Sequence, residues 1–201
     1  LPFTVDAQIA PEKRPDTILR EVFFNYFSYL GYTDMPPGEV DRRLKGSGYD
    51  NPGSVSSLSL AKLREILGVD AVIKGHILDA NNFTGGFYAE TRIHARLVMI
   101  DLLSGELLWE AENHEIDHSS LVTPTIVDIV QQQLENANMR EAYYKVAQEF
   151  SVKVLREIPD PANVPGFEIK LPEIARVQVN LPPKPKLTAG DTIQVNLFGQ
   201  E

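Results

Sequence analysis

The stretch LSLAKLREILGVDAVIKGHILDA, residues Leu58–Ala80, decides the fold of this chain. Apolar residues recur at helical spacing from Leu60 to Leu67, and Gly68 is the residue type that most easily takes the left-handed conformation at a helix end. From Val69 onward, apolar and polar residues alternate with the period of a β-strand that buries one face. The stretch therefore predicts a short helix that runs directly into a central strand.

Two further alternating segments follow this strand. Tyr88–Ile100 alternates cleanly, and Leu107–Ala111 continues the apolar face after the turn Asp101–Gly105. Glycine at the end of that turn suits a bulged β-hairpin. The segment NNFTGGF, Asn81–Phe87, reads as a turn or protruding loop between the central strand and the next one. We expect three antiparallel strands in a meander.

Sequence patterns in the first third of the chain predict a strand and a helix that pack on this sheet. Leu1–Val5 reads as the tail of a first strand, and Pro15–Gly31 as an amphipathic helix with proline in its first turn and glycine at its end. Tyr32–Met35 is a candidate short strand. Gly46–Ser57 is rich in glycine and serine, and its sequence fits a solvent loop better than a phosphate-binding motif.

The last third changes from a helical to a strand pattern. Pro124–Ile158 has a helical apolar stripe, but an unbroken helix of that length would reach roughly 50 Å, so we expect a break near Asn136–Asn138. Residues 159–166 have the composition of a linker. Residues 167–201 alternate as short strands, either the start of a β-sandwich or strands docked on the first domain. The fold class is therefore an α/β domain, residues 1–158, followed by a β-rich extension.

Two motifs carry a resemblance to a known family. LGVDAVIKGHI (Leu67–Ile77) and ARLVMIDLLSGELLWEAE (Ala95–Glu112) resemble a family of bacterial lipoproteins to which no function is assigned. That family is similar to a wider group that includes the secretion lipoprotein CsgG, the cell-wall synthase activator LpoB and the amino-terminal domain of TolB. The resemblance covers roughly residues 1–159, and it implies a mixed sheet packed by helices.

The composition of the chain excludes several kinds of partner and site. A net charge of −9 argues against nucleic acid and against an anionic membrane surface, because both require a basic field. The chain has no cysteine, which excludes disulfides and thiolate metal sites within it. Its apolar runs are too short to cross a bilayer. Because the sequence starts at Leu1 rather than at methionine, we expect a longer precursor.

The resemblance implies a setting and a mode of action. It implies a periplasmic protein whose only membrane attachment is an upstream lipid anchor in the outer membrane. It also implies a non-catalytic module that contacts envelope proteins, as part of a secretion assembly or as a regulator of cell-wall synthesis, and self-association is an open alternative. No long amphipathic hairpins of a membrane pore occur in the sequence. Enzyme motifs and cofactor-binding motifs are also missing, so we expect neither catalysis nor a cofactor.

Histidines suggest an alternative function. A three-residue hairpin loop would place His94 beside His114, and a turn centred on Gly85 would place His76 beside His94. Three imidazoles in one row across three strands could bind zinc or another transition metal. Against a metal site, Lys74, Arg92 and Arg96 on the same face would repel a cation. The alternative function is a metal-binding or small-ligand-binding protein that uses this row of histidines.

The same strand face has a second interpretation. Glutamates and arginines alternate along it, which favours a solvated or partner-facing sheet surface with cross-strand ion pairs. Within it, Arg92 and Arg96 are candidate partner-binding residues. Phe83 and Phe87 either tuck against the edge of the sheet or, if exposed, form a small binding tip. We favour this partner-facing interpretation over the metal site.

Overall fold

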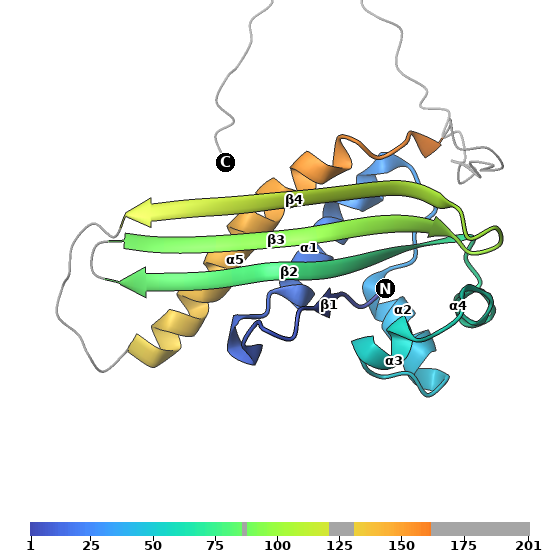
Figure 1. The fold of residues 1–201 in the computed structure, drawn as a ribbon, viewed down its shortest axis with the longest axis horizontal. Coiled ribbons are helices and arrows are strands. Elements are labelled where there is room, and N and C mark those ends of the chain that lie inside the picture. Colours follow the sequence, from blue (N-terminus) through green and yellow to red (C-terminus); the bar gives the residue numbers. More distant parts are fainter. Residues whose placement is uncertain (86–87, 121–130, 162–201) are drawn as a thin grey trace, which may run out of the picture. The chain divides into compact units, whose positions relative to one another are not determined.

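The computed structural model describes residues 1–85, 88–120 and 131–161, and in residues 84–89, 119–120 and 131–138 of these ranges only the backbone is described. The described elements follow one another along the chain in this order (Figure 1): β1 (Thr4–Val5), η1 (Pro11–Lys13), α1 (Asp16–Phe27), η2 (Ser28–Leu30), α2 (Pro37–Gly46), α3 (Pro52–Ser56), α4 (Leu60–Leu67), β2 (Ala71–Gly85), β3 (Tyr88–Asp101), β4 (Leu107–Ser120) and α5 (Gln131–Leu155).

The strands form one mixed sheet in the order β1-β2-β3-β4. β1 runs parallel to β2, whereas β2, β3 and β4 form an antiparallel meander. The meander and the mixed sheet are those that the sequence predicts. The turn between β3 and β4 also matches, since Gly105 has the positive φ of 78° that a bulged hairpin requires.

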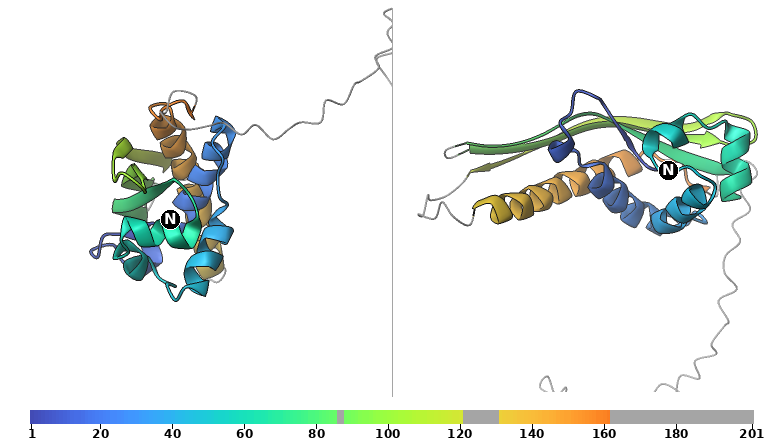
Figure 2. Two further views of the ribbon diagram at one scale, coloured as in Figure 1. Left: turned by 90° about the vertical axis from the view of Figure 1, so that its right-hand side faces the viewer. Right: turned by 90° about the horizontal axis from the view of Figure 1, so that it is seen from below.

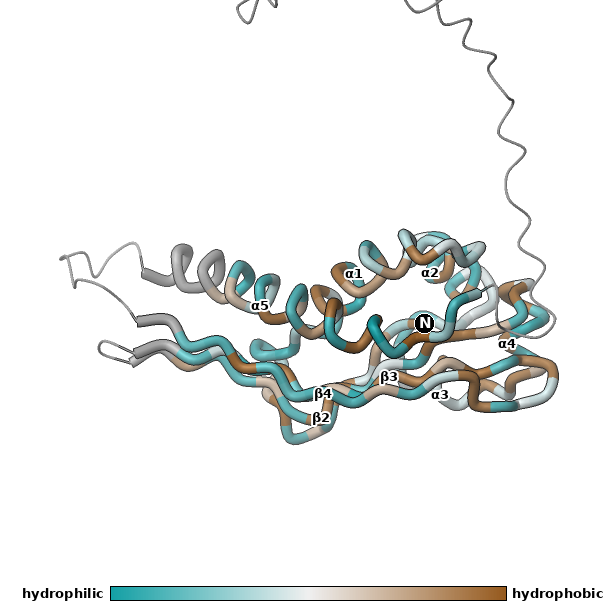
Figure 3. Tube along the Cα trace, turned by 90° about the horizontal axis from the view of Figure 1, so that it is seen from above, coloured by the Kyte–Doolittle hydropathy of each residue, from teal (hydrophilic) through white to brown (hydrophobic). Residues whose placement is uncertain are grey.

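Two helices cover one face of the sheet, which we call the inner face. α1 and α5 lie in a layer against β2–β4 (Figure 2), and apolar and polar residues alternate along the traces of these helices and strands (Figure 3). Alternate residues of β3 are buried there, from Thr91 to Met99. Tyr143, Val146, Phe150 and Val154 of α5 are buried in the same core.

Ion pairs add to the apolar contact between α5 and the inner face. Lys153 Nζ donates to both carboxylate oxygens of Glu115, at 2.8 and 2.6 Å. Lys145 Nζ donates to Asp117 Oδ1 at 2.7 Å. Glu115 and Asp117 are inner-face residues of β4, so two charged side chains of the sheet fix the position of the long helix along the strands.

The helix and turn before the central strand form as the sequence predicts. Ser59 Oγ accepts from the backbone N–H of Lys62 at the start of α4, and Gly68 ends the helix with φ 65°. α2 and α4 bury a second apolar cluster against the beginning of β2. Its buried members are Val40, Leu44, Val55, Leu63, Leu67, Val72 and Leu102.

Glycine in β2 makes room for the chain beside it. Phe3, immediately before β1, lies so close to Gly75 that a Cβ atom at that position would come within 2.6 Å of the phenyl ring. Phe3 is 4% exposed and contacts the ring of Phe23 from α1. Gly75 therefore lets the segment before β1 bury an aromatic side chain under the inner face.

A β-bulge divides β2. Pairing with β3 is regular up to Ile77 opposite Ala95 and resumes with Asp79 opposite His94, so Leu78 is an extra residue. Before the bulge, Gly75 and Ile77 are buried on the inner face; after it, Ala80 is. The bulge thus changes which residues in the alternation point inward.

Several predicted elements differ from the structure. Tyr32–Met35 is not a strand: the Tyr32 ring stacks on Phe27, its hydroxyl donates to the Pro159 carbonyl, and these contacts hold the segment in irregular backbone. Gly46–Ser57 is not only a loop, because α3 forms within it and buries Val55. The expected break near Asn136–Asn138 is also wrong, since α5 continues through these residues.

Most predictions for the carboxyl-terminal part of the chain concern residues outside those that the structure describes. Residues 124–130 of the predicted helix, most of the linker at 159–166 and the whole β-rich segment 167–201 lie outside the described residues. The boundary at residue 158 and the sandwich-like extension stay predictions.

Candidate functional site

The candidate site is the face of the sheet opposite α1 and α5, which we call the outer sheet face. Cross-strand partners share a face, so the pairing of β2, β3 and β4 defines its members. They include Lys74, His76, Asp79 and Phe83 on β2, Glu90, Arg92, His94, Arg96 and Val98 on β3, and Glu110, Glu112, His114, Ile116 and His118 on β4.

Ion pairs cross the outer sheet face, as the alternation of glutamate and arginine predicts. Arg92 binds Asp79 at 2.7 Å and Glu90 at 3.1 Å. Arg96 pairs with Glu110. Desolvation opposes the charge of Arg92, but the two carboxylates outweigh it and raise the pKa of its guanidinium. These pairs are about one-third to one-half exposed, so each stabilises the fold by only about 0.2–1 kcal/mol.

All four histidines of the chain lie on the outer sheet face. His94 pairs with His114 as the sequence predicts, with the ring centroids 5.4 Å apart. His94 Nε2 lies 2.8 Å from Glu112 Oε1, a cross-strand diagonal contact. His118 Nδ1 lies 4.0 Å from Glu90.

The predicted position of His76 is wrong. It pairs with Arg96, whereas Asp79 is the residue opposite His94. Two features move the register: β2 pairs with β3 as far as Gly85 opposite Tyr88, and the bulge inserts one residue. The three imidazoles therefore do not form one row. Across residues 1–85, 88–120 and 131–161, no three or more histidine, cysteine, aspartate or glutamate side chains are grouped to hold a metal ion.

The structure places the four predicted partner-binding residues differently. Arg92 and Arg96 lie on the outer sheet face, and Phe87 lies outside the described residues. Phe83 is 51% exposed, but it stands within β2 opposite Glu90 and not on a loop. The expected loop Asn81–Phe87 is therefore wrong for residues 81–85. Partner binding by these side chains stays a prediction.

Sequence reasoning missed one residue of this surface. Ile116 of β4 pairs with Arg92 and is 37% exposed, so it adds a second apolar side chain near Phe83. The signal was present, because Ile116 shares the alternation of Glu110, Glu112 and His114. An apolar residue on the charged side of a strand indicates a contact surface more strongly than one on the buried side.

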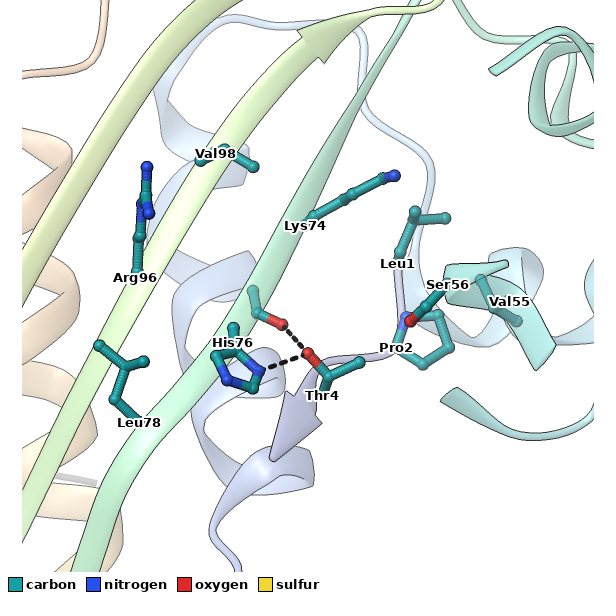
Figure 4. A pocket seen from close by; sticks show the side chains of 11 residues that line it. Leu1, Pro2, Thr4, Val55, Ser56, Lys74, His76, Leu78, Arg96 and Val98 are labelled. Atoms are coloured by element: carbon teal, nitrogen blue, oxygen red, sulfur yellow. Dashed lines mark hydrogen bonds between the residues drawn. The ribbon is translucent and has the colours of Figure 1, made fainter. Parts of the chain in front are cut away.

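The other end of the outer sheet face contains a pocket of about 320 Å³ beside β1 and α3. Figure 4 shows the residues around it. They are Leu1, Pro2, Thr4, Val55, Ser56, Lys74, Gly75, His76, Leu78, Arg96 and Val98. Thr4 and His76, which face each other across the pairing of β1 with β2, hydrogen bond at 2.8 Å.

A family model named "Putative lipoprotein GNA1162-like" matches residues 15–166, which is most of the chain. The chain belongs to this lipoprotein family. None of the curated proteins matches the sequence. Within the described residues of this GNA1162-like protein, no helix has both the length and the apolar character needed to cross a membrane.

Solved structures with a similar fold include the lipoprotein GNA1162 of Neisseria meningitidis, which is 18% identical with a TM-score of 0.53 over 70% of this chain and 93% of that one. The hypothetical protein CT253 of Chlamydia trachomatis is 11% identical, with a TM-score of 0.42 over 78% and 94% of the two chains. PelC of Paraburkholderia phytofirmans, which forms a dodecamer, is 13% identical, with a TM-score of 0.38 over 79% and 83%. At these identities the first likeness shows the fold alone.

Proposed function

We propose that this GNA1162-like domain is a non-catalytic module that binds another envelope protein through its outer sheet face. The observation that carries the proposal is the pair of exposed apolar side chains, Phe83 and Ile116, on the same side of the sheet as Arg92. Exposed apolar groups next to charged ones are typical of protein contact surfaces.

The charges on this surface favour a protein partner over a lipid surface. Arg92 and Arg96 alternate with the carboxylates of Asp79, Glu90 and Glu110, so both signs are presented. A partner with the complementary pattern could exchange these exposed intramolecular pairs for intermolecular ones, which gives specificity more than affinity.

The family supports the cellular setting. Membership in a lipoprotein family favours the periplasm and a lipid anchor in the outer membrane. The resemblance of the motifs at Leu67–Ile77 and Ala95–Glu112 to the CsgG and LpoB group favours two roles within that setting, a subunit of a secretion-type assembly or a regulator of cell-wall synthesis.

Crosslinking in native membranes tests the proposal. The full-length tagged protein is crosslinked and captured, and the same experiment is done with Phe83→Ala and Arg96→Glu. We expect one dominant envelope protein with the wild type and at least a tenfold loss with each variant. Tyr29→Ala is the matched control, because Tyr29 is 88% exposed but lies in η2, outside the outer sheet face.

Two results would contradict this proposal. One is capture that both outer-face variants leave unchanged, and the other is capture that Tyr29→Ala reduces equally. A ladder of the protein alone that Arg96→Glu abolishes would identify a second copy as the partner at this surface.

A further inference from the structure

The pocket beside β1 is distinct from the surface around Phe83. His76 and Phe83 are seven positions apart on β2, which corresponds to about 20 Å along a strand. The pocket has about 320 Å³, which is at the small end of the range of about 300–1000 Å³ for ligand sites. The pocket shares Arg96 with the proposed partner-binding surface, but it can bind a small ligand whether or not that surface binds a protein.

The ionisable side chains that line the pocket are all cationic or able to become so. They are Lys74, His76 and Arg96, and no aspartate or glutamate is among the described residues around it. His76 and Arg96 are direct cross-strand partners. Within the described residues Arg96 has the partner Glu110, whereas Lys74 and His76 have no carboxylate partner although the chain has a net charge of −9. The arrangement is suited to an anion supplied from outside.

Lys74 and Arg96 have donor capacity left for a ligand. Lys74 makes no ion pair within the described part of the chain, and its side chain points into the pocket region (Figure 4). Arg96 pairs with Glu110 on one side, but a guanidinium has five N–H donors and its side chain is 51% exposed.

The third group, His76, is fixed in place by β1. Thr4 Oγ1 lies 2.8 Å from His76 Nδ1 and 3.2 Å from the Gly75 carbonyl oxygen, and these contacts hold the imidazole beside β1 (Figure 4).

The rest of the pocket is apolar. Pro2, Val55, Leu78 and Val98 contribute side chains next to the cationic groups. A small inorganic anion would leave these side chains without a contact, whereas an anion with an apolar group would cover them. The lining thus favours an amphipathic ligand.

We propose that the pocket binds a carboxylate joined to a small branched apolar group, with Lys74 and Arg96 as the cations that attract the carboxylate. Such a group occurs at the C-terminal residue of a peptide and in free branched-chain acids. The two sources share this chemistry, and the experiment below distinguishes them.

Calorimetric titration of the purified full-length protein tests the proposal with three probes. N-acetyl-leucine carries the carboxylate and the apolar group, N-acetyl-leucinamide lacks the charge, and 4-methylpentanoate lacks the peptide group. We expect N-acetyl-leucine to bind with a Kd on the order of 1 mM or tighter, and the amide to bind at least tenfold more weakly. Equal binding of 4-methylpentanoate points to a free acid, and tenfold weaker binding points to a peptide C-terminus.

Variants of the lining residues test whether N-acetyl-leucine binds in the pocket. Lys74→Gln and Arg96→Gln should each weaken N-acetyl-leucine at least tenfold, whereas Arg92→Gln, on the same face but outside the pocket, should leave it unchanged. Thermal melting of each variant verifies folding. The proposal is wrong if N-acetyl-leucine shows no binding at about 10 mM, if acid and amide bind equally, or if folded Lys74→Gln and Arg96→Gln bind as the wild type does.

Discussion

The inner and outer faces of the sheet both carry ion pairs, but the surroundings of these pairs differ. On the inner face Lys153 reaches Glu115, whose side chain is 8% exposed. On the outer face Arg96 and Glu110 are 51% and 35% exposed. A buried charge has lost its hydration and needs a partner of opposite charge to compensate for that loss. An exposed charge is hydrated whether or not it has a partner. The inner pairs therefore hold the helix layer, and the outer pairs leave their charges available for binding.

The largest difference between the faces should appear when apolar side chains are truncated. Phe150 is fully buried in the core under the inner face, so Phe150→Ala should destabilise the domain by about 3–5 kcal/mol. Ile116→Ala on the outer sheet face should change stability by less than about 1 kcal/mol. Urea unfolding measures both free energies, and similar losses would show that another chain segment covers the outer face.

A smaller loss is expected when the inner face is overfilled. Gly75→Ala would place a methyl group against the Phe3 ring, and we expect a destabilisation of about 1–3 kcal/mol. Gly38→Ala in α2, where nothing lies within 4 Å of the new atom, should be close to neutral. If the clash is the cause, Phe3→Leu should cost less in the Gly75→Ala background than in the wild type, as a double-mutant cycle would measure.

The ion pairs themselves give the next comparison. Lys153→Met removes both hydrogen bonds from Lys153 to the buried Glu115 carboxylate, and we expect a loss of about 1–2 kcal/mol. Glu110→Gln, which breaks an exposed outer pair, should change stability by less than about 0.5 kcal/mol. The double variant Glu115→Met/Lys153→Met should recover much of the loss. Equal effects of the two single variants would contradict the distinction between the faces.

The smallest effect concerns two adjacent tyrosines of α5. Tyr143 is 2% exposed and its hydroxyl donates to the Lys13 carbonyl, whereas Tyr144 is 46% exposed. Burial, together with the charge of Asp79, raises the pKa of Tyr143 above its ordinary value. Because the folded pKa is the higher one, the neutral phenol contributes stability below about pH 10 that is lost as the pH rises toward the folded pKa.

Phenylalanine variants isolate that contribution. Tyr143→Phe should cost about 0.5–1.5 kcal/mol at neutral pH through the lost hydrogen bond, and it should lose less stability than the wild type above pH 10. Tyr144→Phe serves as the matched control. Unfolding curves between pH 7 and pH 11 give both quantities, and parallel alkaline losses in wild type and Tyr143→Phe would refute the assignment.

Local sequence patterns predicted the parts of the fold that depend on short-range geometry. The short turn that ends at Gly105 determines the pairing of β3 with β4, so His94 opposite His114 and Met99 opposite Trp109 could be derived from the length of the turn together with the alternation. The end of α4 at Gly68 is equally local, because only the left-handed backbone conformation and a capping serine are needed.

Contacts between distant segments explain what sequence reasoning did not predict. Val55 is buried in a cluster to which α2, α4 and β2 also contribute, and Tyr32 is held by a hydrogen bond to Pro159. The pairing of β2 with β3 depends on polar and glycine residues from Asn81 to Gly85 that show no alternation, and a bulge leaves no mark in composition. The position of His76 was wrong for this reason, and with it the proposed histidine row.

The bulge in β2 also bears on how relatives of this protein should be compared. Leu78 is unpaired between Ile77 opposite Ala95 and Asp79 opposite His94, so the strand could lack this residue and every other pairing would stay as it is. Without Leu78, a simple count from Ile77 would place Phe83 on the outer side. With Leu78 present, the same count places it wrongly on the inner side. A relative without the bulge would need a one-residue gap at Leu78 in an alignment, and its outer sheet face would match this one only when positions are counted from β3.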